Sequence, residues 1–306
     1  MIKILSYIII SIFTITASLA QIKSEEIVVN NMAIQLPGTL TFPSEKSPLI
    51  IWVHGSGSVD RYGNETKYIK QFREEINKNG IAFFSYDKRI ANTKNATFIS
   101  QEGVLINDFI LDIKEVVRYF KKDNRFSEII LAGHSQGSLI AMFALDKVDK
   151  YISIAGAGET IDKTLIRQLN AQNPELSKSA ILHFKQLRET GSIENINPNL
   201  ITLFAKPNQP FWASWININP VEEIKKVKIP TLIINGDKDL QVLVKDAQNL
   251  KEAKSDAKLV IVKNMNHLLK NIENDDDNIK SYQSADFPIS EELIKVISNF
   301  VLTSKK

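Results

Sequence analysis

The sequence predicts an α/β protein with a mainly parallel sheet and helices on both faces. Short, fully apolar runs recur along the chain and end in glycine or polar residues. Such runs are typical of central strands that are buried on both faces. Stretches with apolar residues at helical spacing lie between them. This alternation favours parallel pairing, because each strand returns to the sheet through a helix that packs on it.

The composition is that of an ordinary globular protein. The chain has 306 residues, of which 43% are hydrophobic and 24% charged, so it can form one large α/β domain or two smaller ones. The formal net charge is +3, and charges of both signs are interspersed, which gives no indication of a nucleic-acid partner. The sequence contains no cysteine, which excludes disulfides, thiolate catalysis and cysteine-based metal sites.

The first 20 residues have the layout of a signal peptide. A basic start at Lys3 is followed by an apolar run, and small residues at Ser18 and Ala20 precede the polar Gln21. The alternative is an uncleaved membrane anchor, for which the run is short. We expect cleavage after Ala20, a folded domain over 21–306, and export to the periplasm or the external medium.

The first half of the mature chain contains three predicted strand regions and two predicted helices. In order, they are a hairpin over 27–34 with its turn at Asn30-Asn31, a strand over 48–53, a helix over 65–79, a strand over 81–86 and a helix over 108–120. The strand over 81–86 ends in Asp87-Lys-Arg89, and we expect Asp87 and Arg89 to form an ion pair beneath the site.

A Gly-x-Ser-x-Gly motif lies at the centre of the chain. An apolar run from Ile129 to Ala132 stops at Gly133, Ser135 and Gly137 follow, and an apolar helical run begins at Leu139. A strand followed directly by a helix is the context of a nucleophile elbow, in which a strained turn exposes the serine hydroxyl. Glycines are expected on both sides of the serine because a Cβ there would clash with the neighbouring chain.

The second half resumes the alternation after a long interruption. Predicted strands cover 151–155, 229–235 and 258–262, and predicted helices end near residue 253 and cover about 290–302. Residues 158–220 lack a buried strand and are predicted to form a helical lid over the sheet edge. Trp212 and Trp215 lie in this insertion, where they either wall a substrate pocket or form the core of the lid itself.

A serine nucleophile needs a base to take its proton and an acid to orient the base. Of the four histidines, His267 follows the last strand, where a base belongs in the order serine, acid, histidine. His54 is expected to shape the glycine loop that it opens. His134 is expected to be a structural neighbour that points away from Ser135, and His183 to serve in the packing or on the surface of the lid.

The acid is expected in the loop after the strand over 229–235. Asp237 and Asp239 are both candidates. We favour Asp239 because it lies deeper in the loop, whereas Asp237 directly follows Gly236 and is suited to brace the turn. Two backbone N–H groups are expected to receive the oxyanion, one from Gln136 after the nucleophile and one from Ser56 in the glycine loop.

These motifs resemble those of the α/β-hydrolase superfamily across residues 27–303. The shared motifs, in family order, are His54-Gly-Ser-Gly57, Gly133-His-Ser-Gln-Gly137, Gly236-Asp-Lys-Asp239 and Asn266-His267. Within the superfamily, the chain is similar to bacterial secreted carboxylesterases related to serine-aminopeptidase-like hydrolases. That similarity rests on Asp60-Arg61, Asp87-Lys-Arg89, Ala155-Gly-Ala-Gly158 and Gln209-Pro-Phe-Trp212-Ala-Ser-Trp215.

The resemblance implies an esterase with Ser135, Asp239 and His267 as its catalytic triad. We expect a small-molecule ester with a short to medium acyl chain as substrate, with no metal, no cofactor, no nucleic acid and no obligate protein partner. A peptidase or amidase on the same fold is the alternative, because fold does not choose between these activities. An aminopeptidase needs carboxylates to hold a free amine, and Glu159, Asp162 and Glu175 are available for that role.

Overall fold

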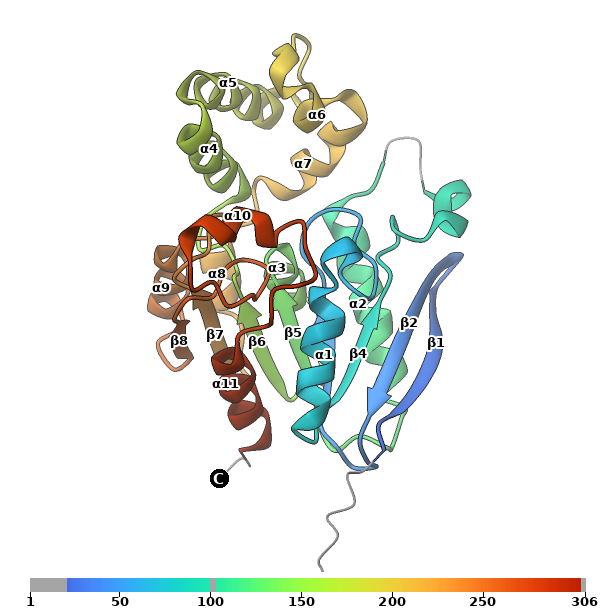
Figure 1. Ribbon diagram of the computed structural model, residues 1–306. Helices are drawn as coiled ribbons and strands as arrows, with labels where there is room; N and C mark the ends of the chain where they lie inside the picture. Colours follow the sequence, from blue (N-terminus) through green and yellow to red (C-terminus); the bar gives the residue numbers. More distant parts are fainter. Residues whose placement is uncertain (1–20, 100–102, 304–306) are drawn as a thin grey trace, which may run out of the picture.

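The computed structural model describes residues 21–99 and 103–303, and it confirms the predicted α/β architecture (Figure 1). The predicted signal peptide, residues 1–20, lies outside the described residues. Eight strands form one sheet in the order β1-β2-β4-β3-β5-β6-β7-β8. They are β1 Lys23–Asn31, β2 Ile34–Phe42, β3 Leu49–Val53, β4 Ala82–Tyr86, β5 Ile129–His134, β6 Lys150–Ile154, β7 Thr231–Gly236 and β8 Lys258–Val262.

The sheet is antiparallel at one edge and parallel everywhere else. β1 pairs with β2 and β2 with β4 in antiparallel fashion, and from β4 to β8 every pair is parallel. Side chains alternate across the sheet, so that Ile50 and Trp52 enter one core while Ile51 and Val53 enter the other. Both faces are therefore buried, which explains the fully apolar runs in the sequence.

Helices cover both faces of the sheet. α1 (Tyr68–Lys78) and α11 (Glu291–Leu302) pack on the face that carries Trp52. α2 (Ile106–Phe120), α3 (Gln136–Met142) and α9 (Val244–Ala253) pack on the opposite face.

The remaining helices lie between the last strands or after them. The segment between β6 and β7 contains α4 Ile161–Gln172, α5 Pro174–Thr190, α6 Ile201–Phe204, α7 Gln209–Trp215 and α8 Pro220–Ile224. Of these, α4 to α7 stand above the sheet domain in Figure 1. The short helix α10 (Asn278–Ser281) follows β8.

The β1–β2 turn differs from the sequence prediction. Asn31 pairs with Ile34, so the two-residue turn is Met32-Ala33 and the asparagine pair belongs to β1. Met32 takes a positive φ of 54°, a conformation in which asparagine is more common, and it is 95% exposed. The register is set instead by the burial of alternate apolar residues such as Val29 and Leu36.

Candidate active site

Ser135 occupies a strained turn between β5 and α3. Its backbone has φ 54° and ψ −121°, a conformation that non-glycine residues rarely adopt. A Cβ on Gly133 would lie 2.3 Å from the carbonyl oxygen of Gly137, and a Cβ on Gly137 would lie 2.1 Å from that of Val53. Glycine is therefore required at both positions by close backbone approach, as the motif predicts.

Asp239 and His267 meet across the loops that follow β7 and β8. Asp239 Oδ2 lies 2.7 Å from His267 Nδ1. The other carboxylate oxygen, Oδ1, accepts hydrogen bonds from the backbone N–H groups of Gln241 (2.8 Å) and Val242 (2.9 Å). Both side chains are buried, so the carboxylate is fixed by its own loop and fixes the imidazole in turn.

Asp237, the other acidic candidate, braces the turn. Its Oδ1 accepts a hydrogen bond of 2.6 Å from the backbone N–H of Asn264. Lys238, between the two candidates, forms an ion pair with Asp275. Asp239 is thus the aspartate that contacts His267, and Asp237 ties the loop after β7 to the loop after β8.

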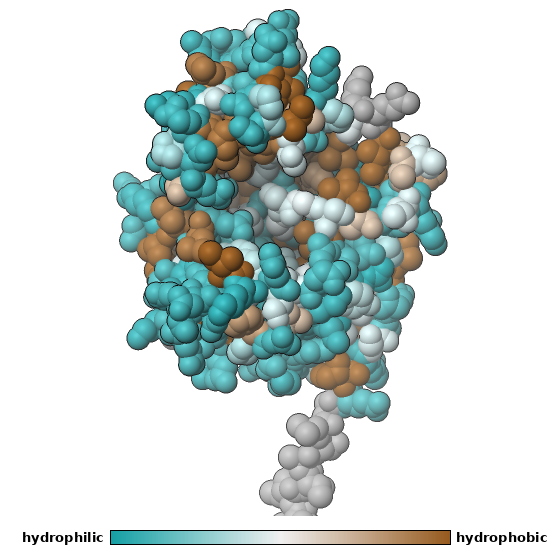
Figure 2. All heavy atoms as spheres, turned by 45° about the horizontal axis from the view of Figure 1, so that its top comes forward, coloured by the Kyte–Doolittle hydropathy of each residue, from teal (hydrophilic) through white to brown (hydrophobic). Residues whose placement is uncertain are grey.

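Ser135 and His267 line one cavity of about 540 Å³. It lies between the sheet edge and the helical insertion, where Figure 2 shows a hollow in the surface. Within the described chain, Ser135 makes no side-chain hydrogen bond to His267. Catalytic hydrogen bonds of free enzymes commonly tighten only when substrate binds. The apolar lining of the cavity includes Val59, Leu139, Ala157, Ile161, Leu165, Trp212, Trp215, Val242 and Leu268.

The two expected oxyanion donors, Ser56 and Gln136, also line this cavity. Gln136 is the first residue of α3, so its N–H has no partner within the helix. Among the described residues, neither this N–H nor that of Ser56 donates a hydrogen bond. The structure therefore brings two free backbone donors to the cavity that holds the serine.

The tryptophans of the insertion combine both roles considered for them. Trp212 and Trp215 stack with ring centroids 5.8 Å apart and both line the cavity. They also belong to an aromatic cluster within the insertion, since Trp212 contacts Phe184 and both contact Phe211. One aromatic cluster thus forms the core of the insertion and one wall of the cavity.

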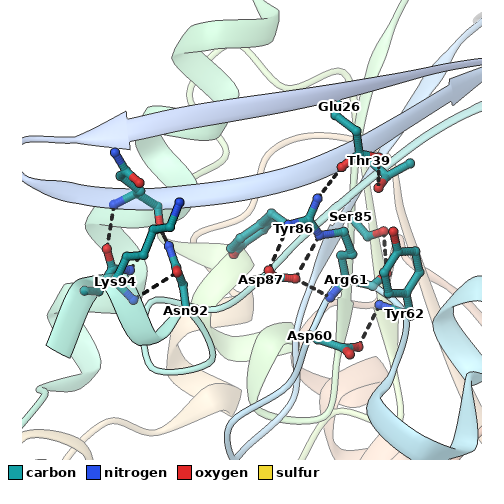
Figure 3. A network of polar contacts seen from close by, with 12 residues as sticks. Glu26, Thr39, Asp60, Arg61, Tyr62, Ser85, Tyr86, Asp87, Asn92 and Lys94 are labelled. Carbon is teal, nitrogen blue, oxygen red and sulfur yellow. Dashed lines mark hydrogen bonds and ion pairs between the residues drawn. The ribbon is translucent and has the colours of Figure 1, made fainter.

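The expected ion pair between Asp87 and Arg89 does not form. Asp87 instead accepts hydrogen bonds from the backbone N–H, Nε and Nη2 of Arg61, each at 2.9 Å (Figure 3). Arg89 pairs with the buried Asp112 of α2 through two hydrogen bonds of 2.8 Å. The side chains of Asp87 and Arg89, two residues apart after β4, point to different partners, and each partner is brought close only by the fold.

The Arg61 network holds the loop that contains Ser56. Arg61 also pairs with Glu26 of β1, and its carbonyl accepts a hydrogen bond from Ser85 of β4 (Figure 3). Asp60 accepts from the backbone N–H groups of Tyr62 and Asn64, both at 2.8 Å. The loop after β3 is thereby anchored to two other strands. The sequence shows the Asp60-Arg61 motif but not its role, because the partners of Arg61 come from distant strands.

His134 lines the cavity, but its ring supports the loop of His267 and is not placed to act as a second base. Its Nε2 lies 2.8 Å from the His267 carbonyl, and because a carbonyl only accepts, this nitrogen carries the proton. The ring stacks on Trp52 with centroids 5.7 Å apart. His54 makes the equivalent contact to the Tyr86 carbonyl, at 2.5 Å. His183 is buried in the insertion and accepts the Asn197 N–H.

Burial lowers the pKa of both His54 and His134 to about 3. For His54 the nearby Lys88 charge lowers the pKa further, and for His134 the His267 ring does so. Both imidazoles are therefore neutral throughout the physiological pH range.

Two further properties concern the described residues alone. In residues 21–99 and 103–303, no helix is both long enough and apolar enough to cross a membrane. The same part of the chain contains no cluster of three or more histidine, aspartate or glutamate side chains placed to hold a metal ion.

This sheet, with its serine turn and its aspartate–histidine contact at the strand ends, defines an α/β-hydrolase fold. The BD-FAE family matches residues 32–253, more than half of the chain, and the protein belongs to this family. The solved structure of Est1E from Butyrivibrio proteoclasticus shares the fold with a TM-score of 0.57 and 18% identity, over 91% of this chain and 99% of that one.

Two curated relatives share sequence similarity with the chain. Esterase EstD of Thermotoga maritima is 26% identical over 257 residues, which is 81% of this chain and 60% of EstD. The probable aminopeptidase YbaC of Bacillus subtilis is 25% identical over 146 residues, which is 47% of this chain and 41% of YbaC. The matched regions thus cover about half the length of these relatives.

We predict that neither His54 nor His134 gains a proton between pH 5 and 8. In ¹³C-detected NMR titrations, with His54→Gln and His134→Gln used for assignment, both rings should keep the shifts of a neutral imidazole. The pKa of each ring is about 3 in the folded state and about 6.5 in the unfolded state, so the unfolded chain binds more protons between these two pH values. The free energy of unfolding is therefore not reduced by these two histidines above pH 6.5, and they lower it progressively as the pH falls from 6.5 toward 3. Titration of either ring near pH 6.5 would contradict the burial argument.

Proposed function

We propose that the protein is a serine carboxylesterase that acts on small esters with short to medium acyl chains. The observation that carries the proposal is the strained Ser135 in the same cavity as His267, with His267 Nδ1 hydrogen-bonded to the buried Asp239. This is the arrangement of nucleophile, base and orienting acid that acyl transfer requires. Similarity to EstD, which is named an esterase, supports the same activity.

The first half of the proposed reaction forms an acyl-enzyme. His267 Nε2 takes the proton of the Ser135 hydroxyl while the serine oxygen attacks the ester carbonyl. Asp239 keeps the proton of the ring on Nδ1, which leaves Nε2 free to act as base, and stabilises the imidazolium that forms. The N–H groups of Ser56 and Gln136 receive the negative oxygen of the tetrahedral intermediate. The intermediate then collapses, and His267 gives its proton to the departing alcohol.

The second half releases the acid. Water enters the place of the alcohol, His267 takes its proton, and the resulting hydroxide attacks the acyl carbonyl. The tetrahedral intermediate expels Ser135, which regains its proton from the imidazolium. The apolar walls from α3, α4 and α7, including Trp212 and Trp215, suit the hydrocarbon part of an acyl group.

The carboxylates of the insertion support an esterase over an aminopeptidase. Of the three available for holding a free amine, only Glu159 lines the cavity, and it pairs with Arg167 at 2.9 Å. Asp162 and Glu175 pair with Arg188 and Lys178. Glu65, the other acidic residue in the lining, is solvent-exposed, so water screens its charge. The similarity to YbaC keeps aminopeptidase activity as the second candidate.

We further propose that the protein is exported and that residues 1–20 are removed. The support is the basic start, the apolar run and the small residues before Gln21.

Hydrolysis of p-nitrophenyl esters from acetate to palmitate should depend on Ser135. We expect turnover to fall by ~10⁴-fold or more in Ser135→Ala because the nucleophile is lost. The wild-type rates across the series should be highest for short to medium chains. An aminoacyl-anilide assayed in parallel distinguishes the two candidate functions: anilide cleavage without ester preference would establish a peptidase. Activity of Ser135→Ala equal to wild type would refute the mechanism.

Asp239→Asn and Asp237→Asn form a matched pair that tests the acid. Asp239→Asn should lower kcat for the best p-nitrophenyl ester by about 10⁴-fold, because asparagine cannot hold the imidazole in the productive tautomer. Asp237→Asn should keep kcat close to wild type, since the amide oxygen of asparagine can still accept the hydrogen bond from the Asn264 N–H. Circular dichroism confirms that both variants fold. Equal losses in the two variants would assign both aspartates the same structural role.

The exported protein should begin at Gln21. We expect expression of the full chain in a Gram-negative host to give a periplasmic product with this N-terminus, identified by mass spectrometry of the intact protein. Ala20→Tyr should block processing, because the cleavage enzyme needs a small residue there. Wild-type protein that keeps residues 1–20 in the membrane fraction would show an anchor instead.

A further inference from the structure

A buried lysine that the proposed reaction does not use lies directly behind the two oxyanion donors. Lys88 follows β4 and is only 3% exposed. Its Nζ donates to the carbonyl oxygen of Gly55 at 2.7 Å and to Gln136 Oε1 at 3.1 Å. On another side the ammonium lies 4.4 Å from the centre of the Phe109 ring. Burial lowers the pKa of Lys88 to about 7, and the negative charge of Asp112 opposes this shift only in part.

The bond to Gly55 acts on the peptide unit that contains the Ser56 N–H. The described peptide bonds are all trans, so the C=O of Gly55 and the N–H of Ser56 point in opposite directions. Because the carbonyl is directed at Lys88, the N–H is directed away from it. A positive charge on the carbonyl oxygen also polarises the peptide and makes its N–H a stronger donor.

The bond to Gln136 fixes the residue that carries the second donor. An ammonium group can only donate, so the amide oxygen of Gln136 must face Lys88 and its Nε2 must face elsewhere. This Nε2 is buried and has no hydrogen-bond partner in the described structure. Lys88 thus joins the loop after β3 to the first turn of α3, the two elements that supply the oxyanion donors.

The charge of Lys88 is not balanced by an ion pair. No carboxylate of the described residues lies within ion-pair distance of Nζ, in contrast to the equally buried Lys150, which pairs with Glu128 at 2.9 Å. Burying an unpaired cation is unfavourable, so a neutral side chain would suit a purely structural role better. The free-energy cost of burying this charge is offset where a negative charge develops close to it during the reaction.

We propose that Lys88 is a positioning residue that orients the Ser56 and Gln136 N–H groups and adds positive potential to the tetrahedral intermediate. The proposal rests on the esterase function proposed above. It differs from an oxyanion donor in that Lys88 acts through the Gly55–Ser56 peptide and the Gln136 side chain and does not touch the substrate.

Substitution of Lys88 should reduce kcat and leave KM nearly unchanged, because the ester binds without a negative oxygen. We expect Lys88→Met to lower kcat for a p-nitrophenyl ester by ~10²-fold, comparable to the loss of one oxyanion donor. Affinity for a trifluoromethyl ketone, whose serine adduct carries the same negative oxygen, should fall by a similar factor. Lys88→Gln, which keeps a donor without the charge, should lie between Lys88→Met and wild type.

Lys150→Met is the matched control, since Lys150 is as buried as Lys88 but bonds to Glu128 and to two carbonyls at the end of α11, far from the oxyanion donors. It should lower the melting temperature and keep kcat per folded molecule. The proposal is overturned if folded Lys88→Met keeps the kcat of the wild type or changes only in KM. In that case, ester hydrolysis that still depends on Ser135 shows that the esterase function stands. Absence of ester hydrolysis in the wild type refutes the function itself.

If both Lys88 variants fail to fold, Phe109→Leu provides the test. It keeps the lysine and removes the aromatic face that holds the ammonium. A drop in kcat of several-fold with unchanged KM supports the proposal, and wild-type kcat overturns it.

Discussion

The close backbone packing around Ser135 is the constraint on which the rest of the site depends. The serine backbone is strained, and such a conformation costs about 1–3 kcal/mol and persists only where its surroundings enforce it. Here β5 is held between β3 and β6, and the Ser135 N–H donates to the Ile154 carbonyl at 2.9 Å. The contact of Gly137 with the end of β3 brings α3 against that strand. The strain is therefore sustained by three neighbouring parallel strands.

The same packing brings the remaining functional groups to one edge of the sheet. Parallel strands end at a common edge of the sheet. The loops after β3, β5, β7 and β8 are therefore close in space although they are far apart in the sequence. Each loop is held by its own buried polar contacts. The loop of His267 is supported by His134 through a carbonyl and by Asn266, whose side chain bonds to Asn278 and Ser281. Because these partners are buried, the side chains are fixed before substrate arrives.

The helical insertion supplies part of the apolar lining of the cavity and is tied to the sheet domain on two sides. Arg167 of α4 bonds to the buried Asp246 at the start of α9, and Phe211 of α7 packs on Phe109 of α2. Phe109 in turn contacts Lys88, so packing of the insertion reaches the group behind the oxyanion donors. The cationic partners of Glu159 and Asp162 also come from the insertion.

Local sequence patterns determined the fold and the identity of the candidate site residues. Apolar runs, helical periodicity and the glycines around Ser135 are short-range signals, because they reflect burial and steric limits at each position. The place of Asp239 and His267 followed from their positions after strands. Tertiary structure alone decided which distant side chains meet. Asp87 pairs with Arg61 and not with the nearby Arg89, and Met32 lies in the β1–β2 turn. Lys88 contacts Gly55 in the loop that contains Ser56. Register and strand order set these distances, and neither can be read from the local sequence.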